Sequence, residues 1–470
     1  MAHVRLFKHY LHIPFIILGL LESFAYMAAM FLAVYARLYI GDLEWNHNPL
    51  EILPGALVYA FTMLICMNAM GVYQAKLKEG LTGMLIRTMV AFAIGSLIFP
   101  LFYYLASDLF GIVWRSVLVL AAVFALLLVG LVRGLFYLLV DDDLFKKRVM
   151  ILGAGHRAKA LMDDFQNSDA NKGFILEGFY PLGDEEVVVP SEMLLPYGNS
   201  IKEVATRHGV EEIVIAAADR RKKLPLDELM SCKLEGLHII DAHTFCEREM
   251  RKVALEMISP SWFIFSDGFQ MSTFSAKAKR CFDIAVSLLL LAFVWPLMLI
   301  TAIFIKLEDG WKAPLFYQQI RVGLDDIPFA VNKFRSMIVA AESNGEAVWA
   351  SKNDSRITRV GNVIRKYRVD ELPQLFNVLK GDMAFVGPRP ERPVFVETLG
   401  EKIPFYKERH RVKPGITGWA QLCFAYAESE EDSAEKLRYD LYYIKNQSLL
   451  LDILIIMQTL EVVLFKKGAQ

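Results

Sequence analysis

The chain has almost no net charge and few cysteines, and each shortage excludes a class of protein. Its 470 residues carry 51 basic and 52 acidic side chains. A chain without a positive excess has no overall attraction for nucleic acid, so we expect no nucleic-acid partner. Its five cysteines show no Cys-x-x-Cys spacing, so we expect reduced thiols and neither a disulfide framework nor a zinc site. No small-residue cleavage site follows the first apolar run, which therefore indicates a membrane anchor rather than a signal peptide.

Long apolar runs are what the chain has instead. Hydrophobic residues make up 55% of it and the mean hydropathy is +0.35. Lysine and arginine gather before the first of four runs, between the second and third, and after the fourth. By the positive-inside rule, both ends of a four-helix transmembrane domain, residues 1–145, then face the cytoplasm. Each run is near the length that crosses a bilayer: Ile13–Val34, Gly55–Val72, Met89–Leu105 and Val117–Val140.

Two ionisable residues, Glu22 and Arg133, fall inside these runs. Charged side chains within a bilayer mark either a transport pathway or a contact between helices. A pathway needs more than two such groups, so we favour a helix–helix contact or a position at the membrane interface.

The middle of the chain, residues 146–265, has the pattern of a nucleotide-binding fold. A buried strand-like run leads into Gly153-x-Gly155-x-x-Ala158 and a helix start, the spacing that places a pyrophosphate on helix amides in Rossmann domains. Further β-like runs alternate with helical stretches, so we predict a Rossmann-like α/β domain. No acidic residue ends a second strand at the ribose-binding distance, and we favour a fold-only, regulatory or oligomerising role over nucleotide binding. The β-like runs are Phe174–Tyr180, Glu212–Ala217 and His238–Asp241.

A fifth apolar run, Ile284–Ile305, is long enough to cross a bilayer but has basic residues on both sides. Pro296 removes a backbone hydrogen bond in its middle and bends the helix. Basic residues at both ends favour a cytoplasmic position for both ends. We therefore predict a Pro-kinked re-entrant helix over residues 281–306, with a fifth span as the alternative.

Two adjacent carboxylates, Asp370 and Glu371, are the strongest candidates for chemistry. They precede a short apolar run in which Pro373 suits the first turn of a helix and Gly381 its end. Several cations, among them Arg365, stand just upstream. Acidic groups held among fixed cations at a helix start can bind a divalent metal and a phosphate together. A capped surface helix with a solvated charge run would explain the same pattern, and the neighbouring motifs decide between the two.

Ordered motifs across the C-terminal third resemble the bacterial sugar transferases, monotopic polyprenyl-phosphate phosphoglycosyl transferases that prime surface polysaccharide synthesis. The complete chain is similar to the large subclass, and its tail, residues 437–446, to members of exosortase-linked exopolysaccharide systems. The chain departs from the family at Asp325-Asp326, where a glycine and a basic residue are more usual, so no phosphate contact is carried over there. The matching motifs are Lys279–Asp283 with Pro296, Tyr317–Gly323, Lys333–Met337, Asp354–Gly361, Asp370–Gln374, Gly387–Pro390 and Lys413–Gln421.

The resemblance implies a membrane protein of α plus α/β class, with a monotopic catalytic domain over residues 275–470. Its implied activity is that of an undecaprenyl-phosphate phosphoglycosyl transferase in the bacterial inner membrane, acting on the cytoplasmic face. Asp370 would attack the sugar-linked phosphate of a UDP-sugar, and UMP would leave. Undecaprenyl phosphate would then take the sugar phosphate from the aspartyl intermediate. Asp370 and Glu371 would hold Mg²⁺, which offsets phosphate charge.

Two cations, Lys333 and Arg365, match positions that the family uses for activity, and the resemblance implies that they contact phosphate or a lipid head group. A third cation, Arg389, is a candidate phosphate contact by its geometry. Arg389 lies between two prolines and offers a planar fork for bidentate contact. Arg365 could equally pair with the carboxylates.

Three other matching positions have structural alternatives. Asp440 matches a functional position of the family, which implies a substrate or phosphate contact, but a salt bridge with Lys436 or Arg438 explains it as well. Trp419 and Gln421 belong to a Gly/Pro-rich loop that lines the nucleotide site or packs in the core.

The last apolar stretch, Leu449–Phe465, is interrupted by polar residues such as Asp452. We expect a helix that lies in the membrane interface or packs in a dimer contact, and we expect a homodimer.

Two other function classes compete with the transferase. A membrane-bound NAD-dependent sugar-nucleotide enzyme would use the middle domain and needs a complete cofactor site. A non-catalytic scaffold of polysaccharide assembly would have a broken carboxylate pair or lack the phosphate cations, and Asp370, Glu371, Lys333 and Arg389 are all present.

Overall fold

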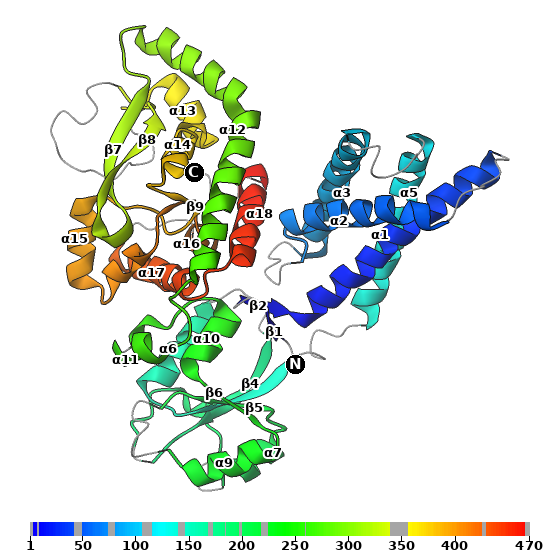
Figure 1. Ribbon diagram of the computed structural model, residues 1–470. Helices are drawn as coiled ribbons and strands as arrows, with labels where there is room; N and C mark the ends of the chain where they lie inside the picture. Colours follow the sequence, from blue (N-terminus) through cyan, green and yellow to red (C-terminus); the bar gives the residue numbers. More distant parts are fainter. Residues whose placement is uncertain are drawn as a thin grey trace. The chain divides into compact units, whose positions relative to one another are not determined.

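The computed structural model divides the chain into two compact units, Met1–Arg251 and Lys252–Gln470. Figure 1 shows the elements of both units in chain order. The residues described are 3–6, 9–41, 49–73, 80–105, 115–139, 146–167, 173–183, 185–196, 200–217, 224–258, 260–338, 356–424 and 429–465. The loops whose charges predicted the orientation of the membrane domain, residues 42–48, 74–79, 106–114 and 140–145, lie outside this range.

Each of the four predicted apolar runs coincides with one helix of the first unit, although the second run continues three residues past the end of its helix and the last residue of the fourth, Val140, lies outside the described residues. Two of these helices, α1 and α5, are long and apolar enough to cross a membrane, and α2 and α3 contain shorter apolar stretches. The bounds are α1 Ile13–Ile40, η1 Pro49–Ile52, α2 Leu53–Ala69, α3 Gly80–Leu105 and α5 Arg115–Leu139, after a short hairpin of β1 His3–Leu6 and β2 His9–His12.

The two ionisable residues of the apolar runs meet, which confirms the predicted helix–helix contact. Arg133 of α5 donates to both carboxylate oxygens of Glu22 in α1, at 2.5 and 3.1 Å. Arg133 also donates to Thr88 of α3. Because both charged groups are buried and paired, their cost inside an apolar bundle is offset, and three helices are tied together.

The middle domain is the predicted α/β fold. Its parallel strands lie in the order β4-β3-β5-β6, and Figure 1 shows α6 and α10 on one side of the sheet and α7 and α9 on the other. The three predicted β-like runs are all strands. The bounds are β3 Lys147–Leu152, α6 His156–Asn167, β4 Phe174–Tyr180, η2 Ser191–Met193, α7 Ile201–Arg207, β5 Glu212–Ile215, α9 Leu226–Leu234, β6 His238–Asp241 and α10 Ala242–Met250.

The glycine turn after β3 is filled by the chain itself. Glu185 Oε2 accepts a hydrogen bond from the amide of Ala154 at 3.1 Å. A side chain on Gly155 would lie 2.4 Å from the other Glu185 oxygen. Gly153 takes a φ of +117° directly against the backbone of Ala216. Close packing within the chain therefore explains why both positions are glycine. The Glu185 carboxylate occupies the place where a pyrophosphate would bind in a dinucleotide-binding turn.

The second unit is built around one long helix, α12 Thr273–Asp309, which continues through Pro296. Figure 1 shows its axis changing direction along its length, as expected for a helix with an internal proline. Helices α13, α14 and α18 and strand β9 contact α12, β9 pairs in parallel with β10, and β7 and β8 form a separate hairpin. A re-entrant path of α12 through the membrane stays a prediction.

The other elements of the second unit follow the chain in this order: η3 Leu255–Met257, α11 Pro260–Phe265, β7 Phe316–Val322, η4 Leu324–Asp326, β8 Pro328–Phe334, α13 Arg359–Lys366, η5 Val369–Glu371, α14 Gln374–Lys380, β9 Ala384–Val386, α15 Pro393–Lys402, η6 Tyr406–Arg411, β10 Gly415–Thr417, α16 Trp419–Cys423, α17 Glu430–Lys445 and α18 Leu449–Phe465. The predicted C-terminal helix is α18, with the same bounds.

The first third of α12 is clamped to the rest of the unit by polar contacts. Lys279 pairs with the fully buried Asp452 of α18 at 2.7 Å and donates to the carbonyl of Val386 at 3.2 Å. Asp283 accepts from the amide of Phe385 at 3.1 Å. These contacts fix β9 and α18 against α12. They give the charged residues of the Lys279–Asp283 motif a structural role.

We expect Lys279→Met to destabilise the second unit by about 3–5 kcal/mol, because it leaves the charge of Asp452 buried without its partner. Adding Asp452→Asn should recover part of that loss. The measurement is chemical unfolding in detergent. Equal losses in the single and double variants would contradict the pairing.

We expect NADH not to bind the full-length protein saturably, because the Glu185 carboxylate engages the amide of Ala154 and would repel a pyrophosphate there. Titration of NADH followed by its fluorescence tests this, with a dinucleotide-dependent dehydrogenase as positive control. Saturable binding to the wild-type chain would show that the turn opens to ligand.

Candidate active site

The two carboxylates lie in a tight turn between two short helices. Arg368 takes a left-handed conformation, with a φ of +55°, and the 3₁₀ turn η5 follows with Asp370 and Glu371. Gly381 ends α14 with a φ of +104°, as the sequence predicted. Pro373 is the residue just before α14 rather than inside its first turn. The turn places both carboxylates beside β8, ahead of α14.

Glu371 is held by cations. Its Oε1 accepts hydrogen bonds from Arg389 at 2.8 Å and from Lys333 at 3.1 Å. Its Oε2 lies 3.7 Å from Arg368. Burial opposes the charge of this carboxylate, but Arg389, Lys333 and Arg368 outweigh burial and hold the pKa of Glu371 well below its usual range. Glu371 is therefore a fixed negative charge at neutral pH.

Asp370 differs from Glu371 in its hydrogen bonding and in the direction of its pKa shift. It is 8% exposed, and no residue in the described part of the chain donates a hydrogen bond to its carboxylate. Burial, reinforced by the charge of Glu371, raises the pKa of Asp370 to about 6. Three cations act in the opposite direction: Lys333, Arg365 and Arg389. At neutral pH this carboxylate is mainly ionised, more basic than an ordinary aspartate, and uncommitted.

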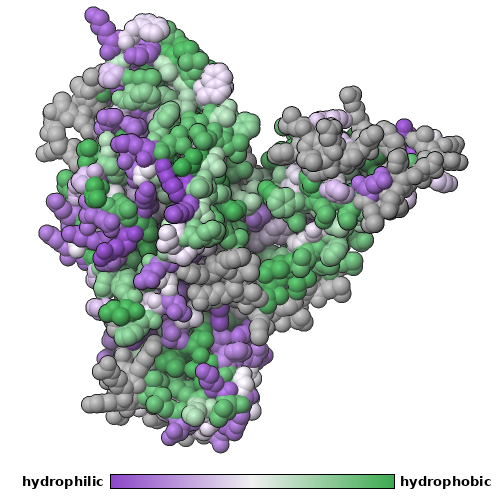
Figure 2. All heavy atoms as spheres, viewed as in Figure 1, coloured by the Kyte–Doolittle hydropathy of each residue, from purple (hydrophilic) through white to green (hydrophobic). Residues whose placement is uncertain are grey.

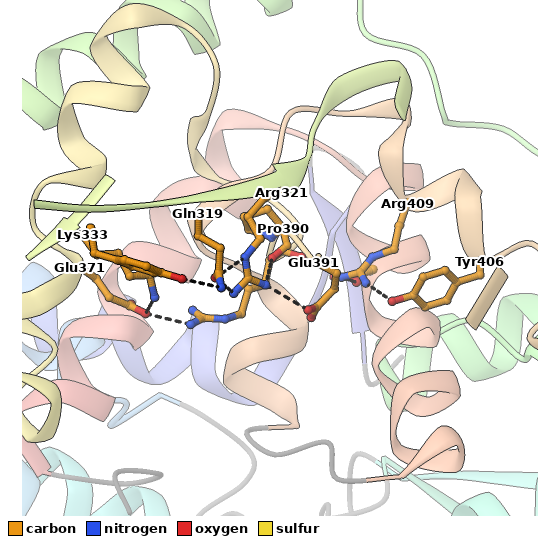
Figure 3. Close-up of polar contacts among 11 residues, drawn as sticks. Gln319, Arg321, Lys333, Glu371, Pro390, Glu391, Tyr406 and Arg409 are labelled. Atoms are coloured by element: carbon orange, nitrogen blue, oxygen red, sulfur yellow. Dashed lines mark hydrogen bonds and ion pairs between the residues drawn. The ribbon is translucent and has the colours of Figure 1, made fainter. Parts of the chain in front are cut away.

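Arg389 reaches the carboxylates from a loop that is itself fixed by other arginines. Arg321 of β7 donates to the carbonyl of Pro390 at 3.1 Å, and Arg409 of η6 donates to the carbonyl of Arg389 at 3.0 Å. Figure 3 shows this row of contacts, which runs from Lys333 and Glu371 past Arg321 to Arg409 and Tyr406. The loop between β9 and α15 is therefore held at its backbone while the guanidinium of Arg389 faces Glu371.

Glycines allow this loop to lie directly against the loop that precedes α16. A side chain on Gly387 would lie 2.4 Å from the carbonyl oxygen of Lys413, and one on Gly415 would lie 2.1 Å from the backbone nitrogen of Gly387. The amide of Gly387 donates to the carbonyl of Thr417 at 2.9 Å. Two of the sequence motifs thus form one packed structure, which requires glycine for steric reasons.

The structure brings all three predicted cations close to the carboxylates, whereas Trp419 and Gln421 have other neighbours. Lys333 and Arg389 contact Glu371, and Arg365 is close enough to lower the pKa of Asp370. Trp419 is buried in the core, where its ring packs against Tyr442. Gln421 is half-buried in the same short helix. A role of Trp419 and Gln421 in a nucleotide site stays a prediction.

Asp440 has a partner that the sequence did not suggest. Its Oδ2 lies 2.9 Å from Arg409, whereas Arg438 donates to Glu435 and to the carbonyl of Val253. The salt bridge expected with Lys436 or Arg438 is therefore made with Arg409, which stands far earlier in the chain and left no local signal. Burial raises the pKa of Asp440 to about 6, although Arg409 acts to lower it.

The departure at Asp325-Asp326 is also explained by a distant contact. Both residues have positive φ values, +52° and +61°, a conformation that favours glycine. Asp326 Oδ1 lies 2.6 Å from Nδ1 of the buried His410. The turn after β7 is thus attached to η6, the same short helix that carries Arg409.

The oxygen atoms of Asp370 and Glu371 suit a metal ion that is bound jointly by the protein and by substrate phosphates. In the described part of the chain no three acidic, histidine or cysteine side chains gather as a metal cage. Mg²⁺ is commonly held by one or two carboxylates together with substrate phosphates. The uncommitted oxygens of Asp370 and the weakly engaged Oε2 of Glu371 fit that arrangement.

The chain is similar to known transferases along most of its length. Residues 274–466 match the family model described as bacterial sugar transferase. A UDP-glucose:undecaprenyl-phosphate glucose-1-phosphate transferase of Klebsiella pneumoniae is 30% identical over 454 residues, which cover 94% of each chain.

A second relative matches more strongly over a shorter stretch. A UDP-N-acetylgalactosamine-undecaprenyl-phosphate N-acetylgalactosaminephosphotransferase of Aeromonas hydrophila is 49% identical over 195 residues, 42% of this chain and 45% of that one. An undecaprenyl-phosphate glucose phosphotransferase of Komagataeibacter xylinus is 41% identical over 42% of this chain and 38% of its own. With the Klebsiella match extending over both units and the family model over the carboxylate site, the chain belongs to the bacterial sugar transferase family.

Proposed function

We propose that this protein transfers a sugar-1-phosphate from a UDP-sugar to undecaprenyl phosphate at the cytoplasmic face of the bacterial inner membrane, and so primes an exopolysaccharide. The names of the Klebsiella and Aeromonas relatives carry this reaction with two different sugars, glucose and N-acetylgalactosamine. We therefore propose the reaction class for this chain and leave the sugar open.

The observation that carries the proposal is the division of labour between the two carboxylates. Glu371 has its charge committed to Arg389 and Lys333, whereas Asp370 has a raised pKa and uncommitted oxygens. A nucleophile needs a free and basic electron pair, and at neutral pH a carboxylate needs no further deprotonation. Asp370 is therefore the nucleophile of the proposed reaction, and Glu371 is the charge that orients the surrounding cations.

The proposed reaction has two displacement steps at one phosphorus. An Asp370 oxygen attacks the sugar-linked phosphorus of the UDP-sugar, the bond to the bridging oxygen breaks, and UMP leaves with that electron pair. An oxygen of undecaprenyl phosphate then attacks the same phosphorus and releases the Asp370 carboxylate. Two mutually repelling anionic substrates thus never occupy the site together. Arg389 and Lys333 stabilise phosphate charge, and a bound Mg²⁺, held by Asp370 and Glu371, would offset the remainder.

The re-entrant path of α12 is part of the proposal. Most of the apolar run of this helix is exposed, and Figure 2 shows apolar side chains along it. Yet both of its ends belong to one folded unit: Lys279 contacts β9 and α18, and Ile305 is buried with Phe334 and Ile364. A straight crossing would separate these contacts by the thickness of the bilayer. A helix that enters and leaves the cytoplasmic leaflet keeps these contacts together.

The homodimer expected from the sequence stays a prediction.

We expect the purified protein to release UMP from one member of a UDP-sugar panel when undecaprenyl phosphate and Mg²⁺ are present. Asp370→Asn should lower turnover at least about a thousandfold, because the nucleophile is lost. Glu371→Gln should lower it about a hundredfold, because the cations lose their anchor. Glu397→Gln on the exposed face of α15 is the matched control and should keep wild-type turnover. Wild-type turnover in Asp370→Asn would refute the proposed nucleophile.

We also expect chelation of divalent cations to abolish UMP release and added Mg²⁺ to restore it. Lys333 and Arg389 already pair with Glu371, so a divalent cation is needed to offset the charge of two substrate phosphates. The assay is UMP release after dialysis against a chelator, with and without added Mg²⁺. Unchanged turnover after complete chelation would show that Lys333, Arg365 and Arg389 are sufficient for the phosphate charge.

A further inference from the structure

Arg409 is a buried arginine of η6 that the family motifs do not single out. It is 6% exposed. One of its terminal nitrogens donates to the hydroxyl of Tyr406 at 2.6 Å, and the other lies 2.9 Å from Oδ2 of Asp440 and donates to the carbonyl of Arg389 at 3.0 Å. A rigid guanidinium with three partners has little freedom to move.

These contacts act on the backbone of the loop that carries Arg389. Arg409 binds the carbonyl of Arg389, Arg321 binds the carbonyl of Pro390, and the amide of Val322 binds the carbonyl of Glu391 at 2.9 Å. Three consecutive carbonyls are thus engaged, two by β7 and one by η6. Because prolines restrict φ at 388 and 390, fixing these carbonyls also fixes the direction in which the Arg389 side chain leaves the loop.

Asp440 is placed to hold Arg409 and is not placed to bind a substrate. It is 1% exposed, and its carboxylate faces Arg409 (Figure 3 shows the guanidinium of Arg409 and its contact with Tyr406). A carboxylate so buried would repel an incoming phosphate if it were reached at all. Its single negative charge instead compensates the charge of a buried arginine.

We infer that Arg409 is a positioning residue for the reaction proposed above, that it acts by fixing Arg389, and that Asp440 acts through Arg409 rather than on a substrate. This inference rests on the proposed function and replaces the substrate contact that the sequence suggested for Asp440. In this arrangement Asp440 and Tyr406 hold Arg409, and Arg409 fixes the backbone of the loop. The loop in turn directs Arg389 toward Glu371 and the substrate phosphate.

The test is a double-variant cycle on UMP release with Arg409→Lys, Arg389→Lys and both together. Each single change should lower kcat/KM by about ten- to a hundredfold, because a displacement on the order of 1 Å at a phosphate contact has that effect. The double variant should be no worse than the more severe single variant, because both changes remove the same placement of Arg389. A role confined to folding would instead give losses that multiply.

Arg438→Lys is the matched control. Arg438 is also 6% exposed and also binds a carbonyl, that of Val253, and carboxylates, those of Glu435 and, at 3.9 Å, Glu256, but none of these groups belongs to the Arg389 loop. We expect its kcat/KM to stay within about twofold of the wild-type value. Melting temperatures in detergent are compared for Arg409→Lys and Arg438→Lys, so that a general loss of folding is recognised.

A milder variant keeps the inference testable if Arg409→Lys does not fold. Tyr406→Phe removes only one acceptor of Arg409 and should lower kcat/KM several-fold, with no further loss in the Arg389→Lys background. Wild-type kcat/KM in Arg409→Lys, or multiplying losses in either cycle, would overturn the inference while wild-type UMP release and the Asp370→Asn result still stood. Absence of UMP release by the wild-type protein with every donor would instead overturn the proposed function, and this inference with it.

Discussion

The site depends on one cluster of charges, in which Glu371 is held by Arg389 and Lys333. Without the carboxylate, two half-buried cations would repel each other; without the cations, a carboxylate largely removed from solvent would take up a proton. Paired, they form a fixed electrostatic frame beside Asp370, whose carboxylate accepts no hydrogen bond from any residue that the structure describes. The frame therefore separates two adjacent and chemically similar residues into an anchor, Glu371, and the proposed nucleophile, Asp370.

The rest of the second unit can be understood as support for that frame. Lys333 comes from a hairpin that follows α12, and Arg389 comes from a loop between β9 and α15 whose carbonyls are held by Arg321 and Arg409. The start of α12 is tied to β9 and α18 through Lys279. A helix whose exposed surface is apolar is thus joined to a polar site, which suits an enzyme whose acceptor lies in a membrane and whose donor is dissolved in water.

The helices and strands were largely predictable from local sequence patterns. The contacts that position the site residues were not, because they join residues far apart in the chain. Apolar period and length predicted the helices of the first unit, and the strand runs of the middle domain were found where expected. The contacts that fix Arg389 join residues far apart in the chain, and nothing near Arg409 in the sequence indicates that its partners are Asp440 and a distant carbonyl. The same holds for Glu185, which closes the glycine turn from a loop. Long-range pairing of this kind leaves no periodic signal.

The most direct test of the account is the mass of the protein after incubation with its UDP-sugar and Mg²⁺ but without undecaprenyl phosphate. The account predicts a covalent sugar-phosphate adduct on the peptide that contains Asp370, which disappears when undecaprenyl phosphate is added and does not form in Asp370→Asn. UMP release at full rate with no adduct on rapid quenching, or an adduct on another residue, would contradict Asp370 as the nucleophile.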